Sequence, residues 1–115
     1  MAEASIYDAL GGEGEVVERI EALPWQAVES SNVLRVAWCE RSAVPQRGRG
    51  KGFALGWLWV QFRSGKIYAY QDVPHATYVA LKGAESVGRA HIALIRGHYS
   101  YCAFDPQTGQ TFSAA

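Results

Sequence analysis

The sequence predicts an α+β fold: a three-stranded antiparallel β-meander packed against two helices, with an N-terminal helical extension and a short C-terminal hairpin. Three observations support this class. Apolar and aromatic residues alternate over residues 57–62, which is typical of a strand. Ser64-Gly65 then provides a turn before a second strand over residues 66–70, which is rich in residues that favour pleated surfaces. Val73-Pro74 ends that strand and opens a helix, because proline is tolerated at the first helical position.

The N-terminal part of the chain predicts two helices. Ser5 and Asp8 have the spacing of a capping box, and Gly11-Gly12 ends the short helix that they begin. A second helix runs from about Glu13 and is closed by Pro24. Its apolar face, which must dock on the rest of the domain, consists of Val16, Val17, Ile20 and Leu23.

A first sheet strand is predicted over residues 33–39, with Val36 and Trp38 on one face. The loop that follows, residues 41–55, is rich in glycine and resembles a small arginine-glycine arm for nucleic acid. A solvated hairpin loop is the alternative interpretation. Its GRGKG segment lacks the GxxxxGK[ST] spacing, so nucleotide hydrolysis is not implied. The basic residues of the loop are Arg41, Arg47, Arg49 and Lys51.

The hairpin can form in two registers. A two-residue turn pairs Phe62 with Ile67, whereas a three-residue turn with Gly65 as a bulge pairs Phe62 with Lys66. We favour the second register, because it gathers on one core-facing side the residues whose spacing resembles that of a known domain family. The residues that it places together are Leu58, Val60, Phe62, Tyr68 and Tyr70.

In that register Trp57 and Trp59 lie on the opposite face, together with Ile67 and Ala69. Such an apolar surface is not left in water without a reason. Either the helix over residues 15–23 covers it, or it binds a partner or stacks on a base.

Two helices follow the hairpin. The first presents Tyr78 and Leu81 inward and ends at Gly83, while Ser86 caps the second, which stops at Gly97. The predicted inward stripe of the second helix is Val87, His91, Leu94 and Ile95. We expect His91 to be a hydrogen-bonded core histidine rather than a catalytic one. Beyond it, the turn sequence of residues 105–109 predicts a C-terminal hairpin.

Charge is unevenly distributed in a chain whose net charge is zero. Residues 1–30 carry seven acidic side chains against Arg19, whereas the remainder carries ten basic side chains against four acidic ones. Because the local field attracts a polyanion more than the net charge does, the basic body is a candidate for binding nucleic acid. Alternatively, the acidic arm folds back and neutralises it.

The chemical repertoire is small. Cys39 and Cys102 belong to no CxxC pair, so a zinc site is not expected; two buried thiols are favoured over a disulfide. The histidines show no HExxH spacing, and only four carboxylates lie outside the arm, which argues against an enzyme. No apolar run approaches the roughly 20 residues of a membrane span, and a cytoplasmic location is expected.

A set of residues at distinctive spacing carries a resemblance to a known family: Ser30-Ser31-Asn32-Val33, Val60, Phe62, Gly65, Tyr68, Tyr70, Val73-Pro74, Tyr78, Leu81, Ala84, Ser86, Gly88, Ile95 and Tyr99. Residues 30–101 resemble the KTSC domain, which is named for the C-terminal end of some lysyl-tRNA synthetases and also occurs as small bacterial proteins. Its hallmark is the pair of tyrosines. The resemblance implies the fold above and the RNA-binding role suggested for that family. The chain departs from it in having His91-Ile92 where the family has Phe-Asn, and in the inserted loop 41–55.

These observations divide the chain into an acidic helical extension (residues 1–29), a KTSC-like domain (30–101) and a C-terminal hairpin or tail (102–115). They predict a non-catalytic module that binds single-stranded or structured RNA. The alternative is a protein-interaction module, such as a small accessory protein or phage-encoded inhibitor docking on a larger complex; an enzyme using His91 or His98 is a third hypothesis. No cofactor, metal or membrane partner is expected. The predicted contact residues are Arg47, Arg49, Lys51, Trp57, Trp59, Arg63, Lys66, Tyr68 and Tyr70.

Overall fold

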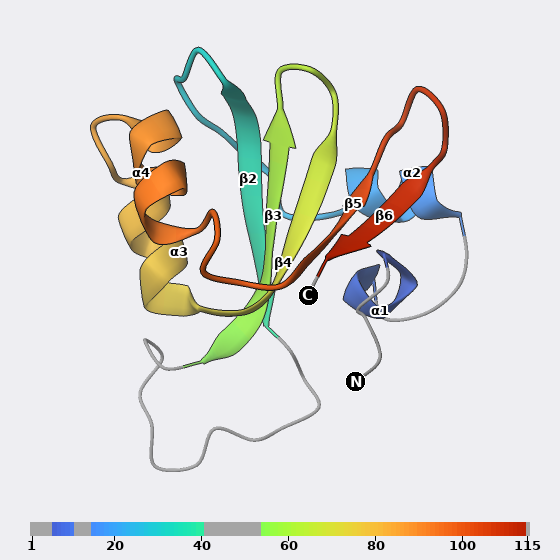
Figure 1. The fold of residues 1–115 in the computed structure, drawn as a ribbon, viewed down its shortest axis with the longest axis horizontal. Helices are drawn as coiled ribbons and strands as arrows, with labels where there is room; N and C mark the ends of the chain where they lie inside the picture. The colour runs from blue at the N-terminus through green and yellow to red at the C-terminus, as the bar shows by residue number, and fades with distance from the viewer. Residues whose placement is uncertain (1–5, 11–14, 41–53, 115) are drawn as a thin grey trace.

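The computed structural model describes residues 6–10, 15–40 and 54–114. In this part of the chain a six-stranded antiparallel sheet has the order β1-β2-β3-β4-β5-β6, so each strand pairs with the next one in sequence (Figure 1). The strands are β1 (Gln26–Ala27), β2 (Val33–Glu40), β3 (Leu55–Phe62), β4 (Ile67–Pro74), β5 (Tyr101–Phe104) and β6 (Thr111–Ala114). The helices are α1 (Ile6–Leu10), α2 (Val16–Glu21), α3 (His75–Lys82) and α4 (Val87–Leu94).

The predicted α+β class is confirmed, but the predicted three-stranded sheet is too narrow. Strands β2, β3 and β4 are the expected meander. The short β1 adds to β2 on one side, and the C-terminal hairpin of β5 and β6 extends the sheet beyond β4 instead of lying apart from it. The pairing of β4 with β5 runs from Ile67↔Phe104 to Tyr70↔Tyr101. It satisfies backbone groups along an edge that would otherwise stay unpaired next to a buried face.

The central hairpin adopts the favoured register, with Gly65 as the bulge. The amide of Phe62 donates to the Lys66 carbonyl oxygen at 3.0 Å, and the Gly65 amide donates to the Phe62 carbonyl oxygen at 2.9 Å. Gly65 has a φ of 100°, a conformation that strains residues with a side chain. This turn places Tyr68 and Tyr70 on the same face as the core residues Leu58 and Val60.

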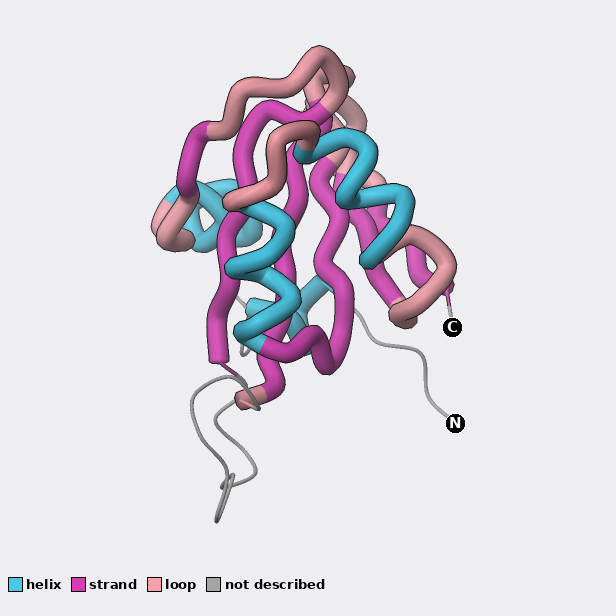
Figure 2. Tube along the Cα trace, turned by 90° about the vertical axis from the view of Figure 1, so that its left-hand side faces the viewer, coloured by secondary structure: helices cyan, strands magenta, loops and turns pink. Residues whose placement is uncertain are grey.

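The sheet is the middle of three layers. Helices α3 and α4 cover one face and α1 and α2 the other, as the two views together show (Figures 1 and 2). Under α3 and α4 lies a core of ten buried residues: Val33, Val36, Leu58, Val60, Tyr70, Val73, Tyr78, Leu81, Val87 and Ile95. The core under α1 and α2 contains Ile6 and Ile20 from the helices, together with Trp57, Trp59, Ile67 and Phe104 from the sheet.

The two tryptophans are therefore not available as a surface platform. Trp57 is 7% exposed and Trp59 is 0% exposed. The N-terminal segment also bonds to the sheet, because Glu21 of α2 pairs with Arg35 of β2 at 2.9 Å. Of the two explanations for the tryptophan face, burial under the N-terminal helices is the one observed.

Strand β4 continues beyond the predicted end at residue 70. The register between β3 and β4 shifts by one residue between Leu58↔Tyr70 and Gly56↔Val73, and Asp72 within this bulge has a φ of 58°. The bulge turns the chain toward α3 and lets Pro74 serve as its N-cap residue. Opposite the bulge, Gly56 has no room for a side chain, since an added Cβ would lie 2.7 Å from the Trp38 ring.

The helices follow the predicted signals, with two errors. Gly83 is the C-cap residue of α3, and the Ser86 hydroxyl accepts a hydrogen bond from the Arg89 amide at the start of α4. However, Leu94 is 39% exposed and Val17 is 53% exposed, although both were assigned to inward stripes. Val17 is one residue, or about 100° of helix rotation, away from Val16, which packs on the core, and Leu94 is the last residue of α4.

Candidate nucleic-acid interface

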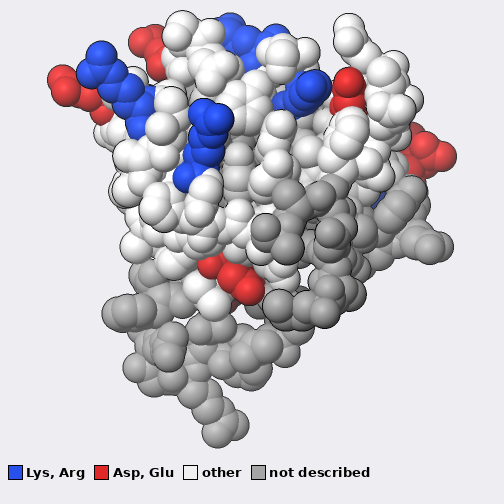
Figure 3. Space-filling model, in the orientation of Figure 1, with Lys and Arg blue, Asp and Glu red and all other residues white. Residues whose placement is uncertain are grey.

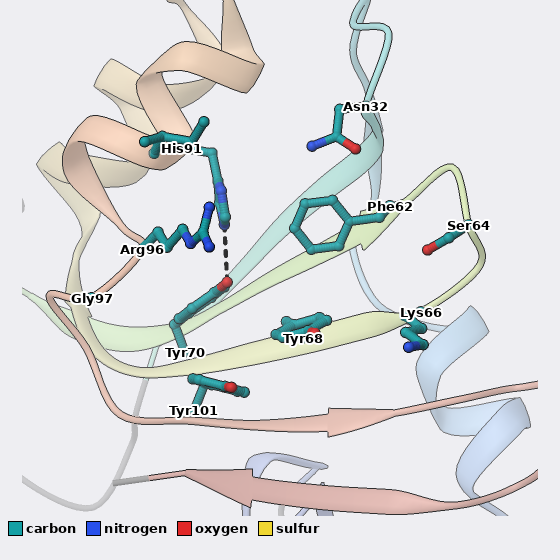
Figure 4. A pocket seen from close by; sticks show the side chains of 11 residues that line it. Asn32, Phe62, Ser64, Lys66, Tyr68, Tyr70, His91, Arg96, Gly97 and Tyr101 are labelled. Atoms are coloured by element: carbon teal, nitrogen blue, oxygen red, sulfur yellow. Dashed lines mark hydrogen bonds between the residues drawn. The ribbon is translucent and has the colours of Figure 1, made fainter.

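A cleft of about 380 Å³ opens on the face of the sheet that carries α3 and α4. The strands supply Phe62, Tyr68, Tyr70 and Tyr101, and α4 with the residues after it supplies His91 and Arg96 (Figure 4). Asn32 and Lys66 lie at its rim. We call this site the tyrosine cleft.

Close ring contacts form the wall of the tyrosine cleft. The Tyr68 ring centroid is 5.1 Å from that of Tyr101 and 5.3 Å from that of Phe62, the latter in an edge-to-face arrangement. Tyr68 and Tyr70 stack at 6.1 Å with planes 21° apart. Such contacts hold aromatic rings in defined orientations. Tyr68, Tyr101 and Phe62 are only partly buried, so their rings remain accessible from the cleft.

The floor of the cleft is a hydrogen-bonded pair. The Tyr70 hydroxyl lies 2.9 Å from His91 Nε2, and these side chains are 4% and 5% exposed. Burial, and then the neighbouring Tyr68 and Tyr101, raise the pKa of Tyr70. Burial, and then the Arg96 guanidinium, lower the pKa of His91. Both shifts favour the neutral forms, so this pair provides hydrogen-bonding groups without charge at neutral pH.

Charge at the cleft is one-sided. Among the described residues that line it, Lys66 and Arg96 are the ionised groups, and none is an aspartate or glutamate. They lie on opposite sides of the aromatic rings (Figure 4). In the space-filling view, basic side chains gather over the upper half of the same face, with carboxylates scattered around them (Figure 3). The cleft can therefore attract an anion and hold an aromatic group beside it.

The structure brings together three of the predicted contact residues. Lys66, Tyr68 and Tyr70 all line the cleft. Trp57 and Trp59 are separated from them by the sheet. The predicted residues of the loop, Arg47, Arg49 and Lys51, lie outside the described part of the chain.

Arg63 has a different role from the expected one. Its Nε donates to the Ser30 carbonyl oxygen at 2.7 Å, and its backbone amide donates to the Asn32 carbonyl oxygen at 2.9 Å. The guanidinium thus ties the β3–β4 turn to the segment that leads into β2. Arg63 supports the rim of the cleft and does not line it.

Sequence reasoning missed several lining residues. Phe62 and His91 were expected in the core, and His91 is indeed buried and hydrogen-bonded. Asn32, Arg96 and Tyr101 had no assigned role. Tyr101 joins the site because β5 pairs with β4, a long-range pairing with no local signal in the sequence. Arg96 follows α4 by two residues, and only the packing of that helix on the sheet directs it to the cleft.

The acidic arm does not screen the cleft in the described part of the chain. Helices α1 and α2 pack on the tryptophan face, while the tyrosine cleft is on the other face. Glu21 neutralises Arg35, which also contacts the Trp25 ring at 4.3 Å and is not a cleft residue. The sheet therefore separates the acidic α2 from the two cations of the cleft.

Other chemistry has little support in the described residues. Cys39 and Cys102 form no disulfide in the described part of the chain, and burial raises the pKa of Cys39. No group of histidine, cysteine or carboxylate side chains with metal-binding geometry occurs among the residues described. None of the described helices has the length and apolar character needed to cross a bilayer.

The comparison with family models matches residues 54–99 to the KTSC domain. This segment contains β3, β4, α3 and α4, and with them Phe62, Tyr68, Tyr70, His91 and Arg96 of the cleft. Asn32 and Tyr101 lie outside this segment, Asn32 well before its start and Tyr101 just after its end. The comparison with curated proteins finds no match.

Proposed function

Because residues 54–99 of this chain are a KTSC domain, we propose that the protein is a non-catalytic module that binds RNA through the tyrosine cleft. The observation that carries this proposal is the placement of partly exposed aromatic rings between two cations, with no carboxylate among the described lining residues. RNA offers the complementary groups, namely bases with π-faces and phosphates with negative charge.

Stacking would supply much of the affinity. A base that stacks on an aromatic side chain gains about 1–3 kcal/mol. Tyr68 is suited to this role, because its ring is held by Phe62 and Tyr101 and remains partly exposed. An already oriented ring loses little conformational entropy when a base binds.

Phosphate contacts would supply the rest. Lys66 and Arg96 are exposed and flank the rings, so each can approach one phosphate of a strand that crosses the cleft. Double-stranded RNA keeps its bases stacked inside the helix, whereas loops and single strands expose them. Single-stranded segments are therefore the proposed ligands.

A salt titration tests the proposal. Fluorescence anisotropy with a labelled single-stranded RNA decamer, repeated at several salt concentrations, should give an affinity that falls linearly on a log-log scale. Tyr68→Leu should weaken binding by about fivefold or more through lost stacking. Phe112→Leu is the matched control, because Phe112 is an exposed aromatic residue of β6 that does not line the cleft.

Absence of RNA binding at low salt would overturn the proposal. Equal losses for the Tyr68→Leu and Phe112→Leu variants would leave RNA binding in place but remove it from the cleft. The competing protein-interaction hypothesis loses the tryptophan face as a docking surface, because Trp57 and Trp59 are covered by the chain's own helices.

A further inference from the structure

The segment before β2 presents an amide side chain to the cleft from a well-supported turn. The Ser30 hydroxyl accepts hydrogen bonds from the Asn32 amide at 3.2 Å and the Val33 amide at 3.1 Å. Arg63 bonds to the Ser30 and Asn32 carbonyl oxygens from the other side. The backbone around Asn32 is thus held by four hydrogen bonds.

The Asn32 side chain does not take part in this network. It is exposed, it lines the cleft, and Figure 4 shows its carboxamide directed into the space beside Phe62. No hydrogen bond links the carboxamide to another described residue. A carboxamide offers one acceptor and two donors, and at this position all of them are available to a ligand.

The dimensions of the cleft limit what can lie against Asn32. A volume of about 380 Å³ is at the small end of the range for ligand sites, which suits one nucleotide better than several. The Tyr70–His91 pair closes the floor, so a base that enters beside Tyr68 stops there. Its polar edge would then be turned toward the rim, where Asn32 carries a carboxamide and Ser64 a hydroxyl. Of the two, only the carboxamide presents a donor and an acceptor on separate atoms, side by side, as a two-point contact with a base edge requires.

From this arrangement we infer that the tyrosine cleft takes one unpaired nucleobase whose edge is read by the Asn32 carboxamide, with Arg63 as the residue that positions Asn32. The inference rests on the proposed RNA-binding function and adds base discrimination to it. Stacking and phosphate contacts tolerate any sequence, whereas a two-point hydrogen bond from a carboxamide does not.

The experiment uses the full chain and four labelled decamers of uridine that carry adenine, cytosine, guanine or uracil at the central position. Wild-type protein should bind the best decamer at least about fivefold more tightly than the poorest, as expected for one paired contact to a base edge. Asn32→Ala should reduce this ratio to less than about twofold and leave the affinity for the poorest decamer unchanged.

Two further variants distinguish base recognition by Asn32 from the positioning of Asn32 by Arg63. Asn32→Asp replaces the amide donor with a second acceptor and should shift the preference toward guanine, which presents two adjacent donors. Arg63→Lys keeps the charge, so the salt dependence of the affinity should stay the same. The ratio of the affinities for the best and the poorest decamer should fall. Ser31→Ala is the matched control, since Ser31 is an exposed neighbour that does not line the cleft.

The outcomes distinguish the inference from the function on which it rests. Equal binding of all four decamers with a steep salt dependence would overturn the role of Asn32 and leave RNA binding intact. An unchanged ratio in Asn32→Ala, with thermal unfolding like the wild type, would also overturn it. Failure of every decamer to bind at low salt would overturn both.

Discussion

The Tyr70 hydroxyl and His91 Nε2 lie 2.9 Å apart, and this bond joins the central strand β4 to helix α4 at the floor of the tyrosine cleft. Both side chains are almost completely buried. A polar pair in such a place costs little while both partners are present, but either partner alone is an unsatisfied buried group. The bond therefore links the stability of the domain to the shape of the site.

Removing one partner of this pair should be costly. Tyr70→Phe leaves His91 Nε2 without its partner and should lower the free energy of unfolding by about 1–3 kcal/mol. The His91→Phe variant should cost a similar amount, and the double variant should cost less than the two together. Urea denaturation measures all three values. Tyr101→Phe is the control, because no hydrogen bond of its hydroxyl is found among the described residues; an equal cost there would contradict the role of the pair.

Stability should decrease on acidification. Burial, and secondarily Arg96, lower the pKa of His91 in the folded protein, so between the folded and unfolded pKa values the unfolded chain binds more protons. The free energy of unfolding should therefore fall as the pH drops below the unfolded histidine value of about 6.5. Urea titrations at pH 7 and pH 5.5 measure this difference. It should shrink in His91→Phe, and an undiminished difference there would assign the pH dependence to other groups.

Two glycines should respond oppositely to alanine. Gly56→Ala places a Cβ against the Trp38 ring and the Cys39 carbonyl oxygen and should cost about 1–3 kcal/mol by overpacking. In α4, an added Cβ at Gly88 meets only the Ser30 hydroxyl, at an ordinary 3.5 Å, so Gly88→Ala should stabilise by up to about 1 kcal/mol. Thermal unfolding of both variants measures these opposite changes in stability. A stable Gly56→Ala protein would show that β2 and β3 can separate locally at no cost.

Trp59 should stabilise the fold through the burial of its ring and not through a hydrogen bond of its indole nitrogen. The ring is fully buried, and its Nε1 has no hydrogen-bond partner among the residues that the structure describes. Trp59→Ala should cost about 3–5 kcal/mol by leaving a cavity. Both variants remove the indole N–H, but Trp59→Phe should cost less than half as much, because the remaining ring fills most of the space. Denaturant unfolding compares the two, and similar losses would contradict the cavity as the main source of the cost.

Phosphate contact should depend on which arginine of the α4 region is removed. Arg96 lines the cleft, whereas Arg89 is exposed on α4 and does not. Arg96→Ala should therefore reduce the log-log salt slope for single-stranded RNA by about 0.7, the value for one phosphate contact. Arg89→Ala removes the same charge from the same helix region and should leave the slope unchanged. Equal changes in the salt slope for the two variants would indicate a diffuse electrostatic attraction instead of a phosphate contact by Arg96.

Local sequence signals were sufficient to predict much of the domain. Alternation in β3, the Ser64-Gly65 turn and the Ser86 cap predicted elements that the structure contains, and the choice between two hairpin registers was correct. These features depend on residues close together in the chain, where backbone sterics and side-chain pattern decide the outcome. The burial of the tryptophans could not be predicted in this way, since it depends on which helices pack against their face of the sheet.

The sequence by itself determined which side chains share each face of the central strands, because side chains alternate with a period of two and one glycine sets the register. The tertiary structure alone decided which face became a site. Helices α1 and α2 covered the tryptophans, while α4 and β5 brought His91, Arg96 and Tyr101 to the tyrosines. Those contacts join segments distant in the chain, and their free energy comes from apolar area buried in common, which no single segment encodes.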